Sequence, residues 1–164
     1  MEITQFIPDS DASWSRTHST IMQFIRRYGG NRITNYAYQE VQRMTPELLA
    51  NVGNAWTLAT LKTEDGRRLA GIALTSDLGH RSSLVVVHPL YRGRRIGTKL
   101  LEAQLLTLGS IRCRVALDNI SSLKMCFQAG LTARKLLLGP TGKPTLVLEY
   151  TQPLPAQSQP AHFV

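Results

Sequence analysis

Apolar residues recur at helical spacing in four segments of the chain. The first segment follows Ser10 or Asp11, either of which can cap a helix, and the second follows Thr45 and closes before Gly53. Residues 31–43 lie between them, are polar with little periodicity, and predict a loop or a frayed helix. The expected helices span residues 11–28, 46–52, 96–108 and 121–129.

Short apolar runs between these helices have the alternating or continuous character of β-strands. Ile111, Cys113 and Val115 alternate with other residues, which predicts a strand buried on one side. Leu84–Val87 is apolar throughout, which predicts a central strand covered on both faces. The expected strands are residues 3–7, 56–61, 68–75, 84–87, 111–117, 136–138 and 145–150. The order of elements, β-α-α-β-β-β-α-β-α-β-β, predicts an α/β protein.

The central strand runs directly into a basic turn that opens the third helix. Gly93 and Gly97 let the backbone come close to a ligand, and Arg92, Arg94 and Arg95 add positive charge. Unpaired N–H groups and the positive end of the helix dipole favour an anion there, so the turn predicts a phosphate-binding site. The spacing of Gly93 and Gly97 excludes both a Walker loop and a dinucleotide-binding fingerprint.

This turn resembles the pyrophosphate loop of the GNAT acyltransferases, whose signature is Gln/Arg-x-x-Gly-x-Gly/Ala after a central strand. The chain matches the signature at Arg92 and Gly97, whereas Arg95 stands where the family has a glycine. A second resemblance lies downstream, where the family has an Asn, a small residue, a Tyr and a Gly-Phe pair. The corresponding residues here are Asn119, Ser122, Cys126, Gly130 and Leu131.

The resemblance implies the GNAT (acyl-CoA N-acyltransferase) fold, with a mixed, mostly antiparallel sheet flanked by helices. In that fold the sheet splays apart between its two central parallel strands. Acyl-CoA lies in the opening, and its pantetheine arm pairs with the exposed backbone of the central strand. The residues that the resemblance assigns to acetyl-CoA binding are Val85, Val87, Arg92, Gly93, Arg94, Arg95, Ile96, Gly97, Thr98, Asn119 and Ser122.

Acetyl transfer from a thioester to an amine needs a polarised carbonyl, a neutral amine and a stabilised leaving thiolate. By the resemblance, the amide of Val87 would polarise the carbonyl. Cys126 would replace the tyrosine that protonates the sulfur, unless it is a small apolar core residue. The family's glutamate position carries Arg81, which cannot accept a proton, so His80 or His88 would relay one through water unless both are ordinary surface histidines.

Composition limits the class of protein further. The 164 residues suffice for one domain, expected at residues 1–151, followed by a flexible proline-rich tail at residues 152–164. The net charge of +8 suits an anionic cofactor or a nucleic acid, and the scattered arginines without a zinc pattern favour the cofactor. With only Cys113 and Cys126, and with no leader or membrane-spanning run, we expect a reduced, cytoplasmic protein that binds no metal.

The sequence therefore predicts an N-acetyltransferase that moves an acetyl group from acetyl-CoA directly to a primary amine. The acceptor is a small molecule or a protein. By the resemblance, the wall of the site that binds the acceptor is expected among residues 26–38, which include Tyr28, Tyr36 and Tyr38 with Arg26, Arg27 and Arg32. Two alternatives stay open: a degenerate GNAT fold that serves as an acyl-CoA-binding or interaction module, and a basic nucleic-acid-binding protein. A homodimer is compatible with the sequence.

Overall fold

The computed structural model describes residues 1–151, and the predicted tail, residues 152–164, lies outside the described residues. The strands are β1 (Glu2–Gln5), β2 (Ala55–Thr63), β3 (Gly66–Ser76), β4 (Ser82–Val87), β5 (Ser110–Ala116), β6 (Thr132–Leu138) and β7 (Pro144–Thr151). The α-helices are α1 (Asp11–Tyr28), α2 (Asn35–Arg43), α3 (Pro46–Leu49), α4 (Ile96–Leu108) and α5 (Ile120–Gln128). Single turns of 3₁₀-helix are η1 (Gly30–Arg32), η2 (Asp77–Gly79) and η3 (Pro89–Tyr91).

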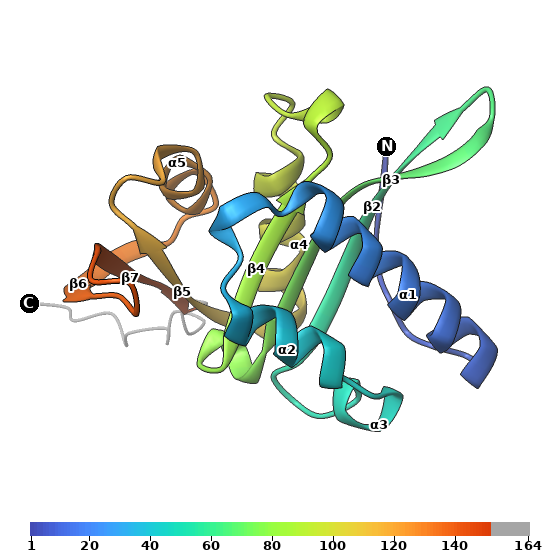
Figure 1. Cartoon of the computed structure of the whole chain (residues 1–164), viewed down its shortest axis with the longest axis horizontal. Coiled ribbons are helices and arrows are strands. Elements are labelled where there is room, and N and C mark those ends of the chain that lie inside the picture. The colour runs from blue at the N-terminus through green and yellow to red at the C-terminus, as the bar shows by residue number, and fades with distance from the viewer. Residues whose placement is uncertain (152–164) are drawn as a thin grey trace, which may run out of the picture.

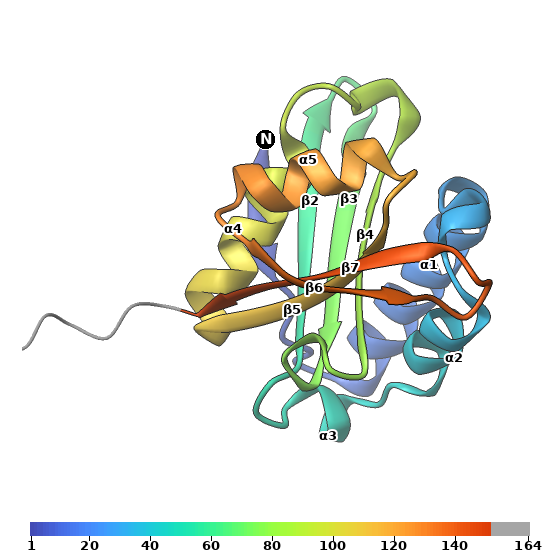
Figure 2. The same ribbon diagram turned by 90° about the vertical axis from the view of Figure 1, so that its left-hand side faces the viewer.

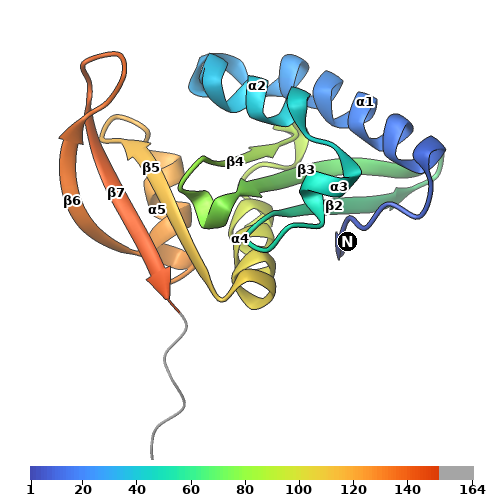
Figure 3. The same ribbon diagram turned by 90° about the horizontal axis from the view of Figure 1, so that it is seen from below.

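The strands form two antiparallel sheets, one in the order β1-β2-β3-β4 and the other in the order β5-β7-β6. Helices α1 and α2 cover one face of the first sheet, and α4 lies against its other face (Figure 1, Figure 3). The second sheet crosses the direction of the first at a steep angle, with α5 beside it (Figure 2). The predicted splayed sheet flanked by helices is confirmed, and its splay is wide enough that no ladder joins β4 to β5 among the described residues.

The two sheets are closest where β4 and β5 begin. Ser83 Oγ lies 3.5 Å from Cys113 Sγ, which ties the start of β4 to the middle of β5. Gly79, with φ +92°, packs so tightly on the backbone of Arg112 that a Cβ at this position would overlap the Arg112 carbonyl. Because β4 and β5 are held together at this end only, they diverge towards Val87 and Ala116 and leave an opening between them.

Helix α4 holds the two sheets together. Ile96 and Leu100 pack with alanines of the first sheet, whereas Leu101 and Leu105 belong to a second core with β5, β7 and α5. Gln104 is fully buried, and its side-chain amide donates hydrogen bonds to the carbonyls of Ala55 and Ala73 on β2 and β3. The helix is therefore apolar on two sides, and its first turn is fixed at the open end of the gap.

The prediction for residues 31–43 was wrong in part, because most of this segment is the regular helix α2. Thr34 begins α2, and its side chain accepts a hydrogen bond from the amide of Ala37. Only Val41 of this helix is fully buried. Ala37, Tyr38 and Val41 do face the core at helical spacing, but they stand in a segment that is otherwise polar, so the helix is easily overlooked in the sequence.

Candidate functional site

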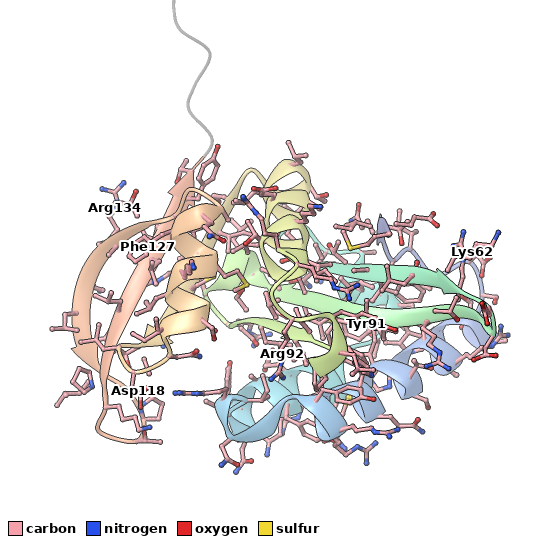
Figure 4. The ribbon with its side chains drawn as sticks, turned by 90° about the horizontal axis from the view of Figure 1, so that it is seen from above. Lys62, Tyr91, Arg92, Asp118, Phe127 and Arg134 are labelled. Atoms are coloured by element: carbon pink, nitrogen blue, oxygen red, sulfur yellow. The ribbon has the colours of Figure 1, made fainter. Side chains whose placement is uncertain are left out.

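The opening between the sheets is a cleft of about 640 Å³. One wall comes from the end of α1 and from η1, and includes Tyr28 and Arg32. The floor is the last half of β4, and the facing wall is the loop before α5 with the first turns of that helix. Figure 4 shows Arg92 and Asp118 on opposite sides of this cleft.

The outer edge of β4 offers unpaired backbone groups to the cleft. The His88 amide donates to the Ala70 carbonyl on β3, and alternate residues of an antiparallel strand point their hydrogen-bonding groups to opposite sides. The N–H and C=O groups of Val86 therefore face β3, and those of Val85 and Val87 face the cleft. The guanidinium of Arg92 donates to the Val87 carbonyl at 3.3 Å, in agreement with this direction. Such an edge can pair with an extended amide-bearing ligand.

The phosphate loop, residues 92–98, ends at the N-terminus of α4. The first intrahelical bond runs from the Lys99 amide to the Arg95 carbonyl, so the amides of Ile96, Gly97 and Thr98 have no partner within the helix. No side chain caps them. The other four α-helices in the described part of the chain each have a side-chain cap, from Ser10, Thr34, Thr45 and Asn119. The positive end of α4 is thus open to an anion.

Backbone conformation explains the pattern of residues in this loop. Gly93 has φ +78°, a conformation that glycine adopts without a steric penalty. Arg95 has φ +60°, although it is not a glycine, and it stands where the GNAT signature has one. The left-handed conformation costs a residue with a Cβ roughly 1–2 kcal/mol. The chain therefore accepts a conformational cost at Arg95 and gains a cation that lines the cleft.

The three arginines of the loop differ in where their side chains lie. Arg92 donates to the Val87 carbonyl and, at 3.4 Å, to the Tyr28 carbonyl, so it joins β4 to the end of α1. Arg95 lines the cleft. Arg94 does not line it, because its guanidinium lies 5.6 Å from the centre of the Tyr91 ring. The prediction that Arg94 contacts the cofactor is not supported by this position.

The N-terminus of α5 meets the same cleft but is closed by its own side chain. Asn119 Oδ1 accepts hydrogen bonds at 3.4 Å from the Ser122 amide and from the Ser121 hydroxyl. Asn119 and Ser122 both line the cleft, as predicted for a cofactor site. The hydroxyl of Thr98 donates to Gln128 at 3.1 Å, which joins the first turn of α4 to the end of α5. Thr98 thus contributes its amide, rather than its hydroxyl, to the cleft.

Cys126 lies in the core of the second sheet and does not line the cleft. Only 1% of its surface is exposed, and it packs with Cys113 and the apolar residues of α4, β5 and β7. Its hydrogen bond with Cys113, together with burial, raises the pKa of the Cys126 thiol far above its usual range. A thiol in this position has no route to a departing sulfur in the cleft. The geometry supports the core interpretation of Cys126 and not the predicted role as proton donor.

The histidines predicted as proton relays lie outside the cleft. His80 is exposed beside η2, at the opposite end of β4 from Val87. His88 Nδ1 accepts a hydrogen bond from the Leu90 amide, and its ring packs 4.4 Å from the centre of the Tyr28 ring. Neither lines the cleft, and neither does Arg81. The structure therefore does not support His80 as a general base.

Asp118 lines the cleft next to Asn119, and no motif in the sequence pointed to it. Its carboxylate accepts hydrogen bonds from Arg32 at 2.8 Å and from Lys143 at 2.9 Å. Donation from Lys143 and Arg32 holds the pKa of the Asp118 carboxyl below its usual range. The network joins η1, the loop before α5 and the β6–β7 hairpin. Three residues so far apart in the chain share no local pattern, so only the folded structure brings them together.

Two of the residues predicted to form an acceptor wall, among residues 26–38, lie in the lining of the cleft, and their role stays a prediction. Tyr28 and Arg32 line the cleft. Tyr36 is 54% exposed and Tyr38 packs against the core of the first sheet, so neither reaches it. Arg27 lies 5.5 Å from the centre of the Tyr28 ring, on the outside of the same wall.

Comparison with solved structures identifies this arrangement of strands, loop and cleft. A chimera of the Vibrio cholerae spermidine N-acetyltransferase SpeG and hSSAT aligns with a TM-score of 0.65 at 13% identity, over 93% of this chain and 96% of that chain. The aminoglycoside acetyltransferase AAC(6')-Ib, solved with coenzyme A and kanamycin, aligns with a TM-score of 0.58 at 16% identity, over 92% and 95%. This chain has the GNAT fold. No protein-family model and no curated protein matches its sequence.

Two other kinds of site are not found in the described residues. Within residues 1–151, no group of three or more His, Cys, Asp and Glu side chains is placed to hold a metal ion. No helix in that range combines the length and the apolar content needed to cross a bilayer.

Proposed function

We propose that this protein is an acetyl-CoA-dependent N-acetyltransferase that acts on a primary amine. The observation that carries the proposal is the position of two complementary backbone features in one cleft. The unpaired edge of β4 at Val85 and Val87 suits the amide-bearing pantetheine arm, and the uncapped first turn of α4 suits a diphosphate. Coenzyme A carries both groups on one extended molecule.

The order of these groups along the chain sets the direction of the cofactor. The diphosphate binds the amides of Ile96, Gly97 and Thr98, with Gly93 and Arg95 beside it. The arm then follows the outer edge of β4 away from the phosphate loop and reaches Val87 before Val85. Because the thioester is at the end of the arm farthest from the diphosphate, we assign its carbonyl to the Val85 amide and not to the Val87 amide that the resemblance implied. Asn119 and Ser122 lie on the facing wall.

The transfer depends mainly on positioning. The amine nitrogen bonds to the acetyl carbon, the carbon–sulfur bond breaks, and the proton that the amine loses passes to the thiolate through solvent. Holding two reactants in line contributes on the order of 7–11 kcal/mol, so a precise cleft needs little from acid and base side chains. Hydroxyl donors near the thiolate come from Tyr28 and Tyr91, which both line the cleft.

Calorimetry with acetyl-CoA, followed by a turnover assay, tests the proposal. We expect saturable binding of acetyl-CoA at low ionic strength, and release of free CoA thiol when a panel of primary amines is added. Absence of binding would refute the cofactor site. Binding without turnover of any amine would favour the interaction-module alternative, whereas binding of DNA or RNA in place of acetyl-CoA would favour the nucleic-acid alternative.

A further inference from the structure

The cleft wall that remains for the amine acceptor lies opposite the phosphate loop. In the proposed function, acetyl-CoA occupies the edge of β4 and the first turn of α4. The rest of the lining comes from the end of α1, from η1, from the loop at Asp118 and from the first turns of α5. The acceptor must therefore approach the thioester past Arg32 and Asp118.

This wall carries a network with more positive than negative charge. Asp118 is the one carboxylate among the described residues that line the cleft, against the cations Arg32, Arg92, Arg95 and Lys124. Its two oxygens already accept from Arg32 Nη1 at 2.8 Å and from Lys143 Nζ at 2.9 Å. Arg32 also donates to the Asp118 carbonyl at 3.5 Å. Two cations on one carboxylate leave a net charge of +1 at the acceptor wall.

In the proposed function the phosphates of coenzyme A bind at the phosphate loop, on the other side of the cleft from Arg32 and Asp118. A polycationic amine at the acceptor wall would find no free carboxylate and would be repelled by Arg32, which lines the cleft; Lys143 does not line the cleft and acts by occupying the second oxygen of Asp118. An amine that also carries a carboxylate would be attracted, since the side chains of Arg32, Asp118 and Lys143 are each about half exposed and open to solvent.

We infer that the Arg32–Asp118–Lys143 network selects a primary amine that bears an anionic group, and excludes polyamines. This inference rests on the proposed function and concerns the acceptor alone. It separates this chain from its solved neighbours, which are named as a spermidine N-acetyltransferase and as an aminoglycoside acetyltransferase bound to kanamycin. Both of those compounds are polycations at neutral pH.

Matched acceptors of equal length test the selection. We expect kcat/KM for 4-aminobutyrate to exceed that for putrescine, and kcat/KM for the C-terminally amidated peptide Ala-Gly-Glu to exceed that for amidated Ala-Gly-Arg. The two pairs distinguish a small-molecule acceptor from a peptide, and one pair with the expected order is enough. Equal rates, faster reaction of the cationic partners, or no reaction of either pair would overturn the inference, and calorimetry with acetyl-CoA reports separately on the cofactor site.

Two variants at the network give opposite expected effects. Lys143→Gln should lower kcat/KM for the anionic acceptor about three- to fivefold, as for an exposed ion pair, with the acetyl-CoA affinity unchanged. Asp118→Asn removes the competing carboxylate and should raise kcat/KM for the same acceptor. Lys62→Gln, on the β2–β3 hairpin far from the cleft, is the control of equal charge change (Figure 4). A fall with Asp118→Asn and no change with Lys143→Gln would mean that the carboxylate recognises an ammonium group, which contradicts the inference.

Discussion

Helices α4 and α5 both direct their N-termini at the cleft, and they treat the unpaired amides of the first turn in opposite ways. In α5, Asn119 accepts from the Ser122 amide and closes the turn from within the chain. In α4, the residue before the helix is Arg95, which has no acceptor to offer and brings a positive charge instead. One side chain before the first turn thus decides whether the N-terminus of a helix is capped within the chain, as in α5, or left open to an anion, as in α4.

The two termini also differ in backbone conformation. Asn119 enters its helix with φ −89°, a negative value that costs no left-handed strain. Arg95 enters α4 with φ +60°, which is unfavourable for any residue with a Cβ. The N-terminus of α5 is thus capped by its own side chain, whereas the N-terminus of α4 keeps free amides and a positive charge that a ligand can use. Substitutions at either N-terminus test this difference.

The largest effect is expected from a carboxylate placed among the free amides of α4. Gly97→Asp should weaken acetyl-CoA binding at least about 100-fold, because the new charge competes for the amides and repels the diphosphate. Gly97→Ala is the control. Its Cβ would lie 2.7 Å from the flexible Met125 Sδ, so it adds bulk without charge and should cost less than about tenfold. Calorimetry with acetyl-CoA measures both, and equal affinities of the two variants would contradict an anion site at this terminus.

The second effect separates two neighbouring arginines of the phosphate loop. Arg95→Gln should weaken acetyl-CoA binding about tenfold, because a charge-assisted contact is lost. Arg94→Gln removes the same charge from a side chain that lies on the Tyr91 ring, and it should change the affinity less than about twofold. The difference between the variants should shrink as salt is raised. A larger loss of acetyl-CoA affinity with Arg94→Gln than with Arg95→Gln would support the predicted contact of Arg94 with the cofactor.

The third effect concerns the closed terminus. Asn119→Ala removes the cap of α5 and should lower the free energy of unfolding by about 1 kcal/mol, which corresponds to a Tm lower by roughly 2–4 °C. Asn119→Asp keeps an acceptor at this position and should retain most of the stability. We expect acetyl-CoA affinity to fall less than about threefold in the alanine variant. A loss comparable to that of Gly97→Asp would mean that α5, too, acts chiefly as a ligand site.

The smallest effect is a gain in stability at the open terminus. Arg95→Gly restores the residue of the GNAT signature and removes the left-handed strain, although glycine also makes the unfolded chain more flexible. The net gain should be about 0.5 kcal/mol in the free energy of unfolding, measured by urea denaturation. Acetyl-CoA affinity should fall at the same time, as in Arg95→Gln. A variant that is less stable than the parent would show that the Arg95 side chain supports the fold.

The elements that the sequence predicted correctly are those with strong local signals. The central strand was visible because four consecutive apolar residues form it, although only Leu84 and Val86 are buried and Val85 and Val87 are half-buried. The phosphate loop was visible because glycines and arginines follow this strand at once. The cap at Asn119 was also predictable, since an Asn between a strand and a helix has a local role. Helix α2 was missed because it buries only one residue, so its sequence is polar nearly throughout.

The candidate site was predictable only where backbone groups form it. The free amides of α4 follow from the order of strand, loop and helix, whereas Val85 and Val87 were assigned by the resemblance to the GNAT family and stay predictions. The roles of side chains were harder to predict, because packing decides where a side chain points. The Arg94 side chain lies over the Tyr91 ring, and the Cys126 side chain lies in the core. The acceptor wall was the least predictable part.

The sequence alone determined the order of the strands and the glycine- and arginine-containing turn before α4, because periodicity, glycine positions and charge act within a few residues. The tertiary structure decided the width of the cleft, which backbone groups of β4 face it, and the charge of its wall at Arg32 and Asp118. The Arg32–Asp118–Lys143 network shows why. Its members lie on three segments distant in the chain, and their ion pairs exist only once packing of α4 between the two sheets has brought those segments together.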